Sequence, residues 1–218
     1  MNDQDSRSHQ MFIRAREYMA QSVDDFAAGG AARQLYADLQ TGIQTFEQKI
    51  AAHGAGVSDE RRGTHARSEM RDALTHELEL IRNAARVMGV LDQFPRPPQS
   101  DDEELLQLAD VYAAHALPLK AQFIAHELAA DFLENLTEDK AAFQTAIATQ
   151  GNAKGDHISA RQELSEARDY CLERVRKLDG LIKIRYANNP GKLAEWTAAS
   201  HIERPAKRAK PLTPPAAP

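Results

Sequence analysis

Apolar residues recur at helical spacing along almost the whole chain. Residues 6–26 show the pattern clearly, because intervals of three and four residues separate Phe12, Ala15, Met19, Val23 and Phe26. Such spacing places these side chains on one face of a helix. The same period continues through four later stretches. They are residues 31–53, a stretch that begins between Ser58 and Thr64 and ends near Gly89, residues 118–150 and residues 156–188. Each stretch is therefore predicted to be an amphipathic helix with one apolar stripe facing a core.

Glycine clusters mark the predicted turns between these helices. Gly29-Gly30 ends the first helix, and Gly54-Ala55-Gly56 is predicted to turn the chain between the next two. A third turn is predicted at residues 151–155, after which Asp156 is placed to cap the following helix. Each of the segments 31–89 and 118–188 thus reads as a helical hairpin, with a bend near Asn135–Thr137 in the second.

Prolines mark the other boundaries. Residues 94–99 hold three prolines and cannot be helical, because proline lacks a backbone donor and restricts its neighbour. The Ser100–Glu103 stretch then matches a capping box, and Pro118 suits the first position of a helix. The Asn188-Asn189-Pro190 sequence ends one helix and starts a short last one, over residues 190–202.

The two predicted hairpins share a pattern of residues. The stretch Ala66–Met70 pairs with Ala160–Leu164, and further upstream Leu39, Phe46 and Ile50 pair with Leu136, Phe143 and Ile147. The two separations differ by the length of the glycine-rich turn, which favours an internal duplication over chance similarity between amphipathic helices. Two packed hairpins hide both apolar stripes, so the prediction is an all-α four-helix bundle. The long crossover, residues 90–117, suits a ferritin-like order.

Composition and charge narrow the class of protein. Ala, Leu, Glu, Gln and Arg dominate, and these residues favour helices. A formal charge of −5 argues against a large nucleic-acid surface. No stretch resembles a signal peptide or reaches the length of a membrane span, so a cytoplasmic location is expected. Residues 1–204 are predicted to form one domain, and the Pro- and Lys-rich residues 205–218 to be disordered.

Few residues suggest metal or acid–base chemistry. The chain lacks the Glu-x-x-His pattern of ferritin-like di-iron proteins. The weak candidates for a metal site are His126, Glu127 and His76, with His126 expected to be partly buried. The alternative, a core-edge histidine with a satisfied hydrogen bond, is favoured because no partner motif accompanies it. No catalytic residue and no cofactor are predicted.

Cys171 and Trp196 have structural as well as functional interpretations. Cys171 lies on the apolar stripe of its helix, where a thiol behaves as a small hydrophobic group. Trp196, the only tryptophan, shares one face of the last helix with Leu193 and Ile202. It is predicted either to dock against the end of the bundle or to anchor a protein partner.

Several stretches resemble a known group of bacterial proteins. They are Asn188–Arg204, Pro118–Glu127 and Ala130–Glu134. Together they are similar to an uncharacterised family of helical bacterial hypothetical proteins that is frequent in acidobacterial genomes. The resemblance implies a bacterial, helical protein and carries no activity, cofactor or site residue to this chain.

The sequence therefore favours a non-enzymatic helical bundle that acts in protein–protein interaction or scaffolding, with a protein partner or a homo-oligomer. The alternative is a ligand- or metal-binding four-helix bundle of ferritin-like type, with enzymatic activity as one option. Neither nucleic-acid binding nor a membrane span is expected.

Overall fold

The computed structural model describes residues 3–203, and in this range it contains helices and no strand. The predicted all-α class is confirmed. The helices are α1 (Asp3–Ser22), α2 (Ala31–Val87), α3 (Asp102–Ala116), α4 (Lys120–Ala125), α5 (Phe132–Arg185) and α6 (Pro190–Ser200). Short 3-10 turns add Val23–Asp25, Leu91–Gln93 and Leu117–Leu119. The tail prediction for residues 205–218 falls outside the described residues.

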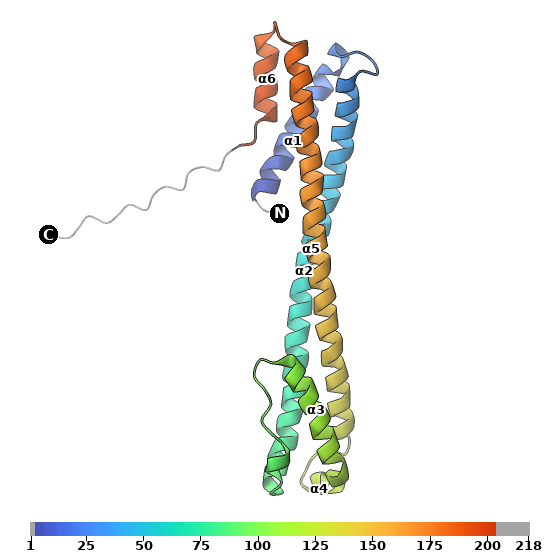
Figure 1. The fold of residues 1–218 in the computed structure, drawn as a ribbon, viewed down its shortest axis with the longest axis vertical. Helices are drawn as coiled ribbons and strands as arrows, with labels where there is room; N and C mark the ends of the chain where they lie inside the picture. The colour runs from blue at the N-terminus through green and yellow to red at the C-terminus, as the bar shows by residue number, and fades with distance from the viewer. Residues whose placement is uncertain (1–2, 204–218) are drawn as a thin grey trace, which may run out of the picture. The chain divides into compact units, whose positions relative to one another are not determined.

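The two long helices run through both predicted glycine turns. Helix α2 has 57 residues and α5 has 54, and each is a continuous α-helix (Figure 1). The structure therefore contradicts the predicted turns at residues 54–56 and 151–155, the cap at Asp156 and both helical hairpins. The four-helix bundle was inferred from these hairpins and loses that support. The physical reason is that a helical glycine costs only about 1 kcal/mol relative to alanine, which good neighbouring helix formers outweigh.

Two of the glycines in α2 allow it to lie close to α5. A Cβ atom at Gly63 would lie 3.2 Å from the Cα atom of Gln150, and one at Gly56 would lie 3.4 Å from the Cα atom of His157. A Cβ atom at Gly63 would push the facing backbone of α5 away by a few tenths of an ångström, whereas one at Gly56 would make ordinary contact. At neither position is glycine a signal for a turn.

The helices end where the backbone adopts left-handed conformations. Gly89, with φ 73°, ends α2, and the amide of Val90 donates to the Ala85 carbonyl, as in a Schellman motif. Glu127, with φ 70°, does the same after α4, where the Leu128 amide donates to the Phe123 carbonyl. The helix predicted over residues 118–150 is therefore interrupted at residues 126–131. Asn135–Thr137, where a bend was predicted, lie inside α5 near its start.

The predicted caps are partly correct. Pro190 begins α6, as the Asn188-Asn189-Pro190 sequence predicted, and Asn189 caps this helix by accepting a hydrogen bond from the Lys192 amide. The cap of α3 is Asp101, which accepts from the Glu104 amide at 2.9 Å, one residue later than the predicted box. Pro118 lies in the 3-10 turn between α3 and α4 and does not begin a long helix.

The chain divides into two compact units, each with its own core. Unit 1 comprises residues 1–53 and 161–218, and unit 2 comprises residues 54–160. The core of unit 1 joins α1, the first part of α2, the last part of α5, and α6. Its fully buried members include Phe12, Met19, Leu39, Phe46, Cys171, Leu178 and Trp196. The prediction of a single domain over residues 1–204 stays a prediction.

Unit 2 is built around Phe94, which the sequence placed in an irregular connection. The ring of Phe94 is fully buried and packs edge-on against Tyr112 of α3 at 5.1 Å and Phe123 of α4 at 5.6 Å. The hydroxyl of Tyr112 donates to the Pro95 carbonyl. Residues from the second part of α2 and the first part of α5 complete this core. The predicted crossover therefore supplies part of a core.

The buried positions of α2 recur in α5 after 97 residues. Leu39 and Phe46 precede buried Leu136 and Phe143 by this interval. The same interval, from 74 to 171 for example, relates Leu74, Leu78, Ile81 and Ala85 to Cys171, Val175, Leu178 and Ile182, all buried. The shorter separation used to pair Met70 with Leu164 does not match the buried positions. It was needed only to accommodate the turns that the structure lacks.

Candidate functional site

The weak metal candidates do not converge. His126 ends α4 and is exposed, against the expectation of partial burial, and its Nδ1 lies 2.8 Å from the Gln122 carbonyl. Glu127 is exposed in the left-handed turn that follows, and His76 is exposed on α2. Among residues 3–203, no group of three or more His, Cys, Asp or Glu side chains is arranged to hold a metal ion.

His76 instead lies beside an acidic pair that the sequence did not single out. Burial raises the pKa of Glu77, and the charge of Asp139 raises it further. The pKa of Asp139 is raised by burial and by Glu138. Although His76 is near both carboxyl groups, no group of three His, Cys, Asp or Glu side chains within residues 3–203 is arranged to hold a metal ion.

Trp196 is a core residue of unit 1. Its side chain is 1% exposed, its Nε1 donates to Asp179 Oδ1 at 3.0 Å, and its ring lies 5.3 Å from that of Tyr18. A partner protein could reach the indole only if α6 moved away. Of the two predictions for Trp196, docking within the protein describes its position.

Cys171 is fully buried, in agreement with its place on the apolar stripe. Burial raises the pKa of its thiol to about 12, and the charge of Arg174 opposes this only in part. A nucleophilic cysteine needs a low pKa and access to solvent. Cys171 has neither property.

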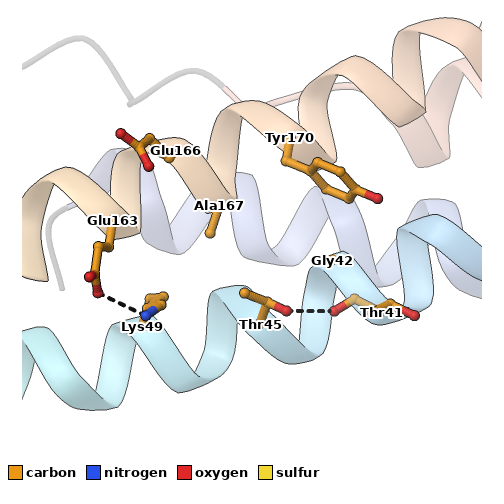
Figure 2. A pocket seen from close by; sticks show the side chains of 8 residues that line it. All are labelled: Thr41, Gly42, Thr45, Lys49, Glu163, Glu166, Ala167 and Tyr170. Atoms are coloured by element: carbon orange, nitrogen blue, oxygen red, sulfur yellow. Dashed lines mark hydrogen bonds and ion pairs between the residues drawn. The ribbon is translucent and has the colours of Figure 1, made fainter.

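A hollow lies in unit 1, between α2 and α5 (Figure 2). Its volume is about 510 Å³. Its lining comprises Thr41, Gly42, Thr45 and Lys49 from α2, and Glu163, Glu166, Ala167 and Tyr170 from α5. We call it the unit 1 groove.

Gly42 shapes the floor of the unit 1 groove. A Cβ atom at this position would lie 2.9 Å from Cys171 Sγ and 3.0 Å from the ring of Tyr170. Because real Cβ atoms essentially never approach other atoms so closely, only glycine lets the Tyr170 ring rest against the backbone of α2. Tyr170 is 38% exposed and forms one wall. The guanidinium of Arg174 stacks 3.5 Å from the ring centre.

The groove is lined by two carboxylates, Glu163 and Glu166, and by one cation, Lys49. Lys49 Nζ pairs with Glu163 Oε2 at 2.8 Å, and Figure 2 shows this pair closing one end. Glu166 accepts a hydrogen bond from Gln162 at 2.9 Å and pairs with no cation among residues 3–203. The hydroxyls of Thr41 and Thr45 donate to carbonyls one turn earlier in α2. The groove therefore leaves one exposed negative charge beside apolar and aromatic surface.

Helix α1 covers the other side of this helix pair. Phe12 of α1 packs edge-on against Phe46 of α2 at 5.7 Å, and α1 residues share the unit 1 core with α5. In Figure 2 the pale violet ribbon of α1 passes behind α2 and α5, whereas the labelled side chains face the viewer. One face of the pair is thus packed and the opposite face is open.

A repeated motif that the sequence analysis missed ties the helices together. Residues 68–72 read Ser-Glu-Met-Arg-Asp and residues 165–169 read Ser-Glu-Ala-Arg-Asp. In unit 1, Arg168 Nη1 bonds Asp5 Oδ1 at 3.2 Å. In unit 2, Arg71 pairs with Asp102. All four side chains are at most 17% exposed, so both pairs are shielded enough to matter for stability.

No helix within residues 3–203 is long and apolar enough to cross a membrane. No family model matches the chain, and neither a curated protein nor a solved structure is significantly similar to it.

Proposed function

We propose that this protein is a non-enzymatic helical scaffold and that its unit 1 groove binds an α-helical segment of a partner protein. The observation that carries the proposal is the open face of the α2–α5 pair in unit 1, with Tyr170 resting on Gly42. Two adjacent helices present ridges and grooves that a third helix fills with its side chains. α1 fills this role on the opposite face.

The chemistry of the groove defines the partner. Ala167 lines the groove with a small apolar side chain, and Tyr170, packed against Gly42, offers an aromatic surface typical of binding hot spots. Glu166 is free to meet a cation, whereas Lys49 is already paired with Glu163. The partner is therefore an amphipathic helix with lysine or arginine beside its apolar face.

The positions related by 97 residues support a specialised role for this groove. Asp139 stands where the unit 1 groove has Gly42, and Ala73 stands where it has Tyr170. Unit 2 forms its core without a glycine or a tyrosine at these places. The Gly42–Tyr170 contact is thus not a requirement of this way of packing helices.

We further propose that the chain arose by tandem duplication, with residues 5–87 as repeat 1 and residues 102–184 as repeat 2. Support comes from the common interval of the buried positions and from the repeated Ser-Glu-x-Arg-Asp motif. Bacterial origin and a cytoplasmic location remain proposals from the sequence. The alternative of a ligand- or metal-binding bundle has no cluster of ligands within the described residues to support it.

The test uses a fluorescent synthetic peptide with leucine and alanine at positions i, i+3, i+4 and i+7 and lysine on the flanks. The full-length protein is expected to bind it, and to bind poorly a version broken by a central proline. Thr45→Arg places a cation in the groove and should weaken binding at least tenfold. Gln44→Arg adds the same charge to the neighbouring exposed residue outside the groove and should leave binding unchanged.

Fluorescence anisotropy measures both dissociation constants, and thermal melting verifies that both variants fold. Equal binding of the intact and proline-broken peptides would contradict the proposal. Equal loss of binding in Thr45→Arg and Gln44→Arg would contradict it as well, because the effect would then depend on charge alone.

A further inference from the structure

The two compact units are each assembled from both repeats. Unit 1 takes α1 and the first part of α2 from repeat 1, and the last part of α5 from repeat 2. Unit 2 takes α3, α4 and the first part of α5 from repeat 2, and the second part of α2 from repeat 1. Neither repeat therefore completes a core by itself.

The interval of 97 residues extends to the helices that begin the repeats. Asp5 of α1 precedes Asp102 of α3 by this interval, and Phe26 precedes Phe123. Buried Ser8, Phe12, Ala15 and Met19 of α1 likewise precede buried Leu105, Ala109, Tyr112 and Ala116 of α3. α1 and α3 thus occupy equivalent places, each against a long helix.

Each ion pair joins an aspartate of one repeat to an arginine of the other, and the two pairs use equivalent positions. Asp5 of repeat 1 pairs with Arg168 of repeat 2, and Asp102 of repeat 2 pairs with Arg71 of repeat 1. Asp102 also pairs with Arg67, which has no equivalent in unit 1 because residue 164 is a leucine. Arg71 and Arg168 are the same position of the repeated motif. Each arginine is fixed by a second contact, Arg168 Nη2 to Ser165 Oγ at 3.2 Å and Arg71 Nη2 to the Pro98 carbonyl at 2.9 Å.

We infer that the Ser-Glu-x-Arg-Asp segment of each long helix is a docking surface for the first helix of the other repeat, with the aspartate–arginine pair as the contact that selects it. The partner that this surface fits is a second copy of the repeat. The docking surface carries the shielded arginine, and the first helix of the other repeat carries the aspartate that pairs with it. A helix with a cation in place of the aspartate is rejected, because like charges facing each other are strongly unfavourable. The inference rests on the tandem repeat proposed above and is independent of the groove.

The test is a charge-reversal matrix in the full chain. Asp5→Arg and Asp102→Arg are each combined with Arg168→Asp and with Arg71→Asp, and unfolding is followed in urea. Each aspartate reversal alone should raise the unfolding equilibrium constant of its unit by about 10- to 100-fold, less than for a fully buried pair because the arginines are slightly exposed. Arg168→Asp should recover most of the loss caused by Asp5→Arg. Arg71→Asp should recover part of the loss caused by Asp102→Arg, because Arg67 still faces position 102.

The same-repeat combinations, Asp5→Arg with Arg71→Asp and Asp102→Arg with Arg168→Asp, should show no recovery. Glu17→Arg, an exposed reversal on α1, should neither destabilise the chain nor respond to Arg168→Asp. Recovery in only one unit, recovery within a repeat, or simple additivity would each overturn the inference. If the reversals prevent folding, Asp5→Asn and Arg168→Gln measured as a double-mutant cycle give the same information, with additivity as the contradicting result. None of these readouts depends on helix binding at the groove.

Discussion

Gly54 lies inside a continuous helix, and the stability of Gly54→Ala tests that position. A Cβ atom at Gly54 would have no atom within 4 Å, and the residue does not adopt a left-handed φ. Alanine should therefore remove backbone freedom from the unfolded chain without any clash. The expected gain is about 1 kcal/mol in the free energy of unfolding, or a melting temperature raised by about 2–4 °C.

Two other glycines of α2 serve as matched controls. Gly63→Ala brings a Cβ atom to 3.2 Å from the backbone of α5 at Gln150, so the two helices must separate slightly and the gain should disappear. Gly42→Ala meets Cys171 Sγ at 2.9 Å and the Tyr170 ring at 3.0 Å. Overpacking costs about 1–3 kcal/mol, which exceeds the helix-propensity gain, so this variant should be destabilised.

Urea titration followed by circular dichroism at 222 nm gives all three free energies. The expected order of stability is Gly54→Ala above wild type, Gly63→Ala near or below it, and Gly42→Ala lowest. A loss of stability in Gly54→Ala would refute the reasoning, because alanine is unfavourable only if this residue turns the chain. Equal values for Gly54→Ala and Gly63→Ala would show that α2 does not approach α5 closely.

Three further predictions follow from buried groups. Cys171 should react slowly with a thiol reagent at pH 8 in the native protein and rapidly in denaturant; rapid labelling of the native state would place it at the surface. Burial raises the pKa of Cys171 from 9.0, and of Tyr112 from 10.0, to about 12. The unfolded chain therefore loses these protons first, and the stability measured in urea melts should fall as the pH rises from about 9 toward 12. Trp196→Phe should cost about 1 kcal/mol in the same melts, because Asp179 Oδ1 loses the indole donor while Oδ2 keeps Lys183. Wild-type Trp196 should also emit at short wavelength and resist iodide quenching, and red-shifted, quenchable emission would contradict its burial.

The sequence was sufficient for the helical class and for the stripes that face the cores. The spacing of Phe12, Ala15 and Met19 identified buried positions of α1 correctly. The cap at Asn189 was predictable because it depends on residues three positions apart. These features are local, and local patterns determine them.

Glycine was the main source of error, because its effect depends on what faces it. The same residue type ends a helix at Gly89, where φ is positive, and continues one at Gly54 and Gly63. Nothing adjacent to Gly63 in the sequence announces that Gln150 will lie against it. Because of the predicted turns, the two halves of the chain were aligned with two different separations, which concealed both the common interval of 97 residues and the motif around Arg168.

The unit 1 groove could not be predicted either. It depends on Gly42 and Tyr170, which are far apart in the sequence, and on α1 covering one face of the helix pair and leaving the other open. The aspartates at positions 5 and 102 looked like ordinary charges near helix starts. Their partners became evident only when the two long helices lay side by side within each unit.

The continuity of α2 and α5 is the claim on which the units, the groove and the repeat all depend. Cα chemical shifts measured by NMR across residues 53–57 of α2 and 150–156 of α5 test it directly. We predict uninterrupted helical shifts in both stretches, with the glycines included. Random-coil or turn shifts at Gly54–Gly56 or Gly151–Gly155 would contradict the account and restore the two hairpins that the glycines suggested.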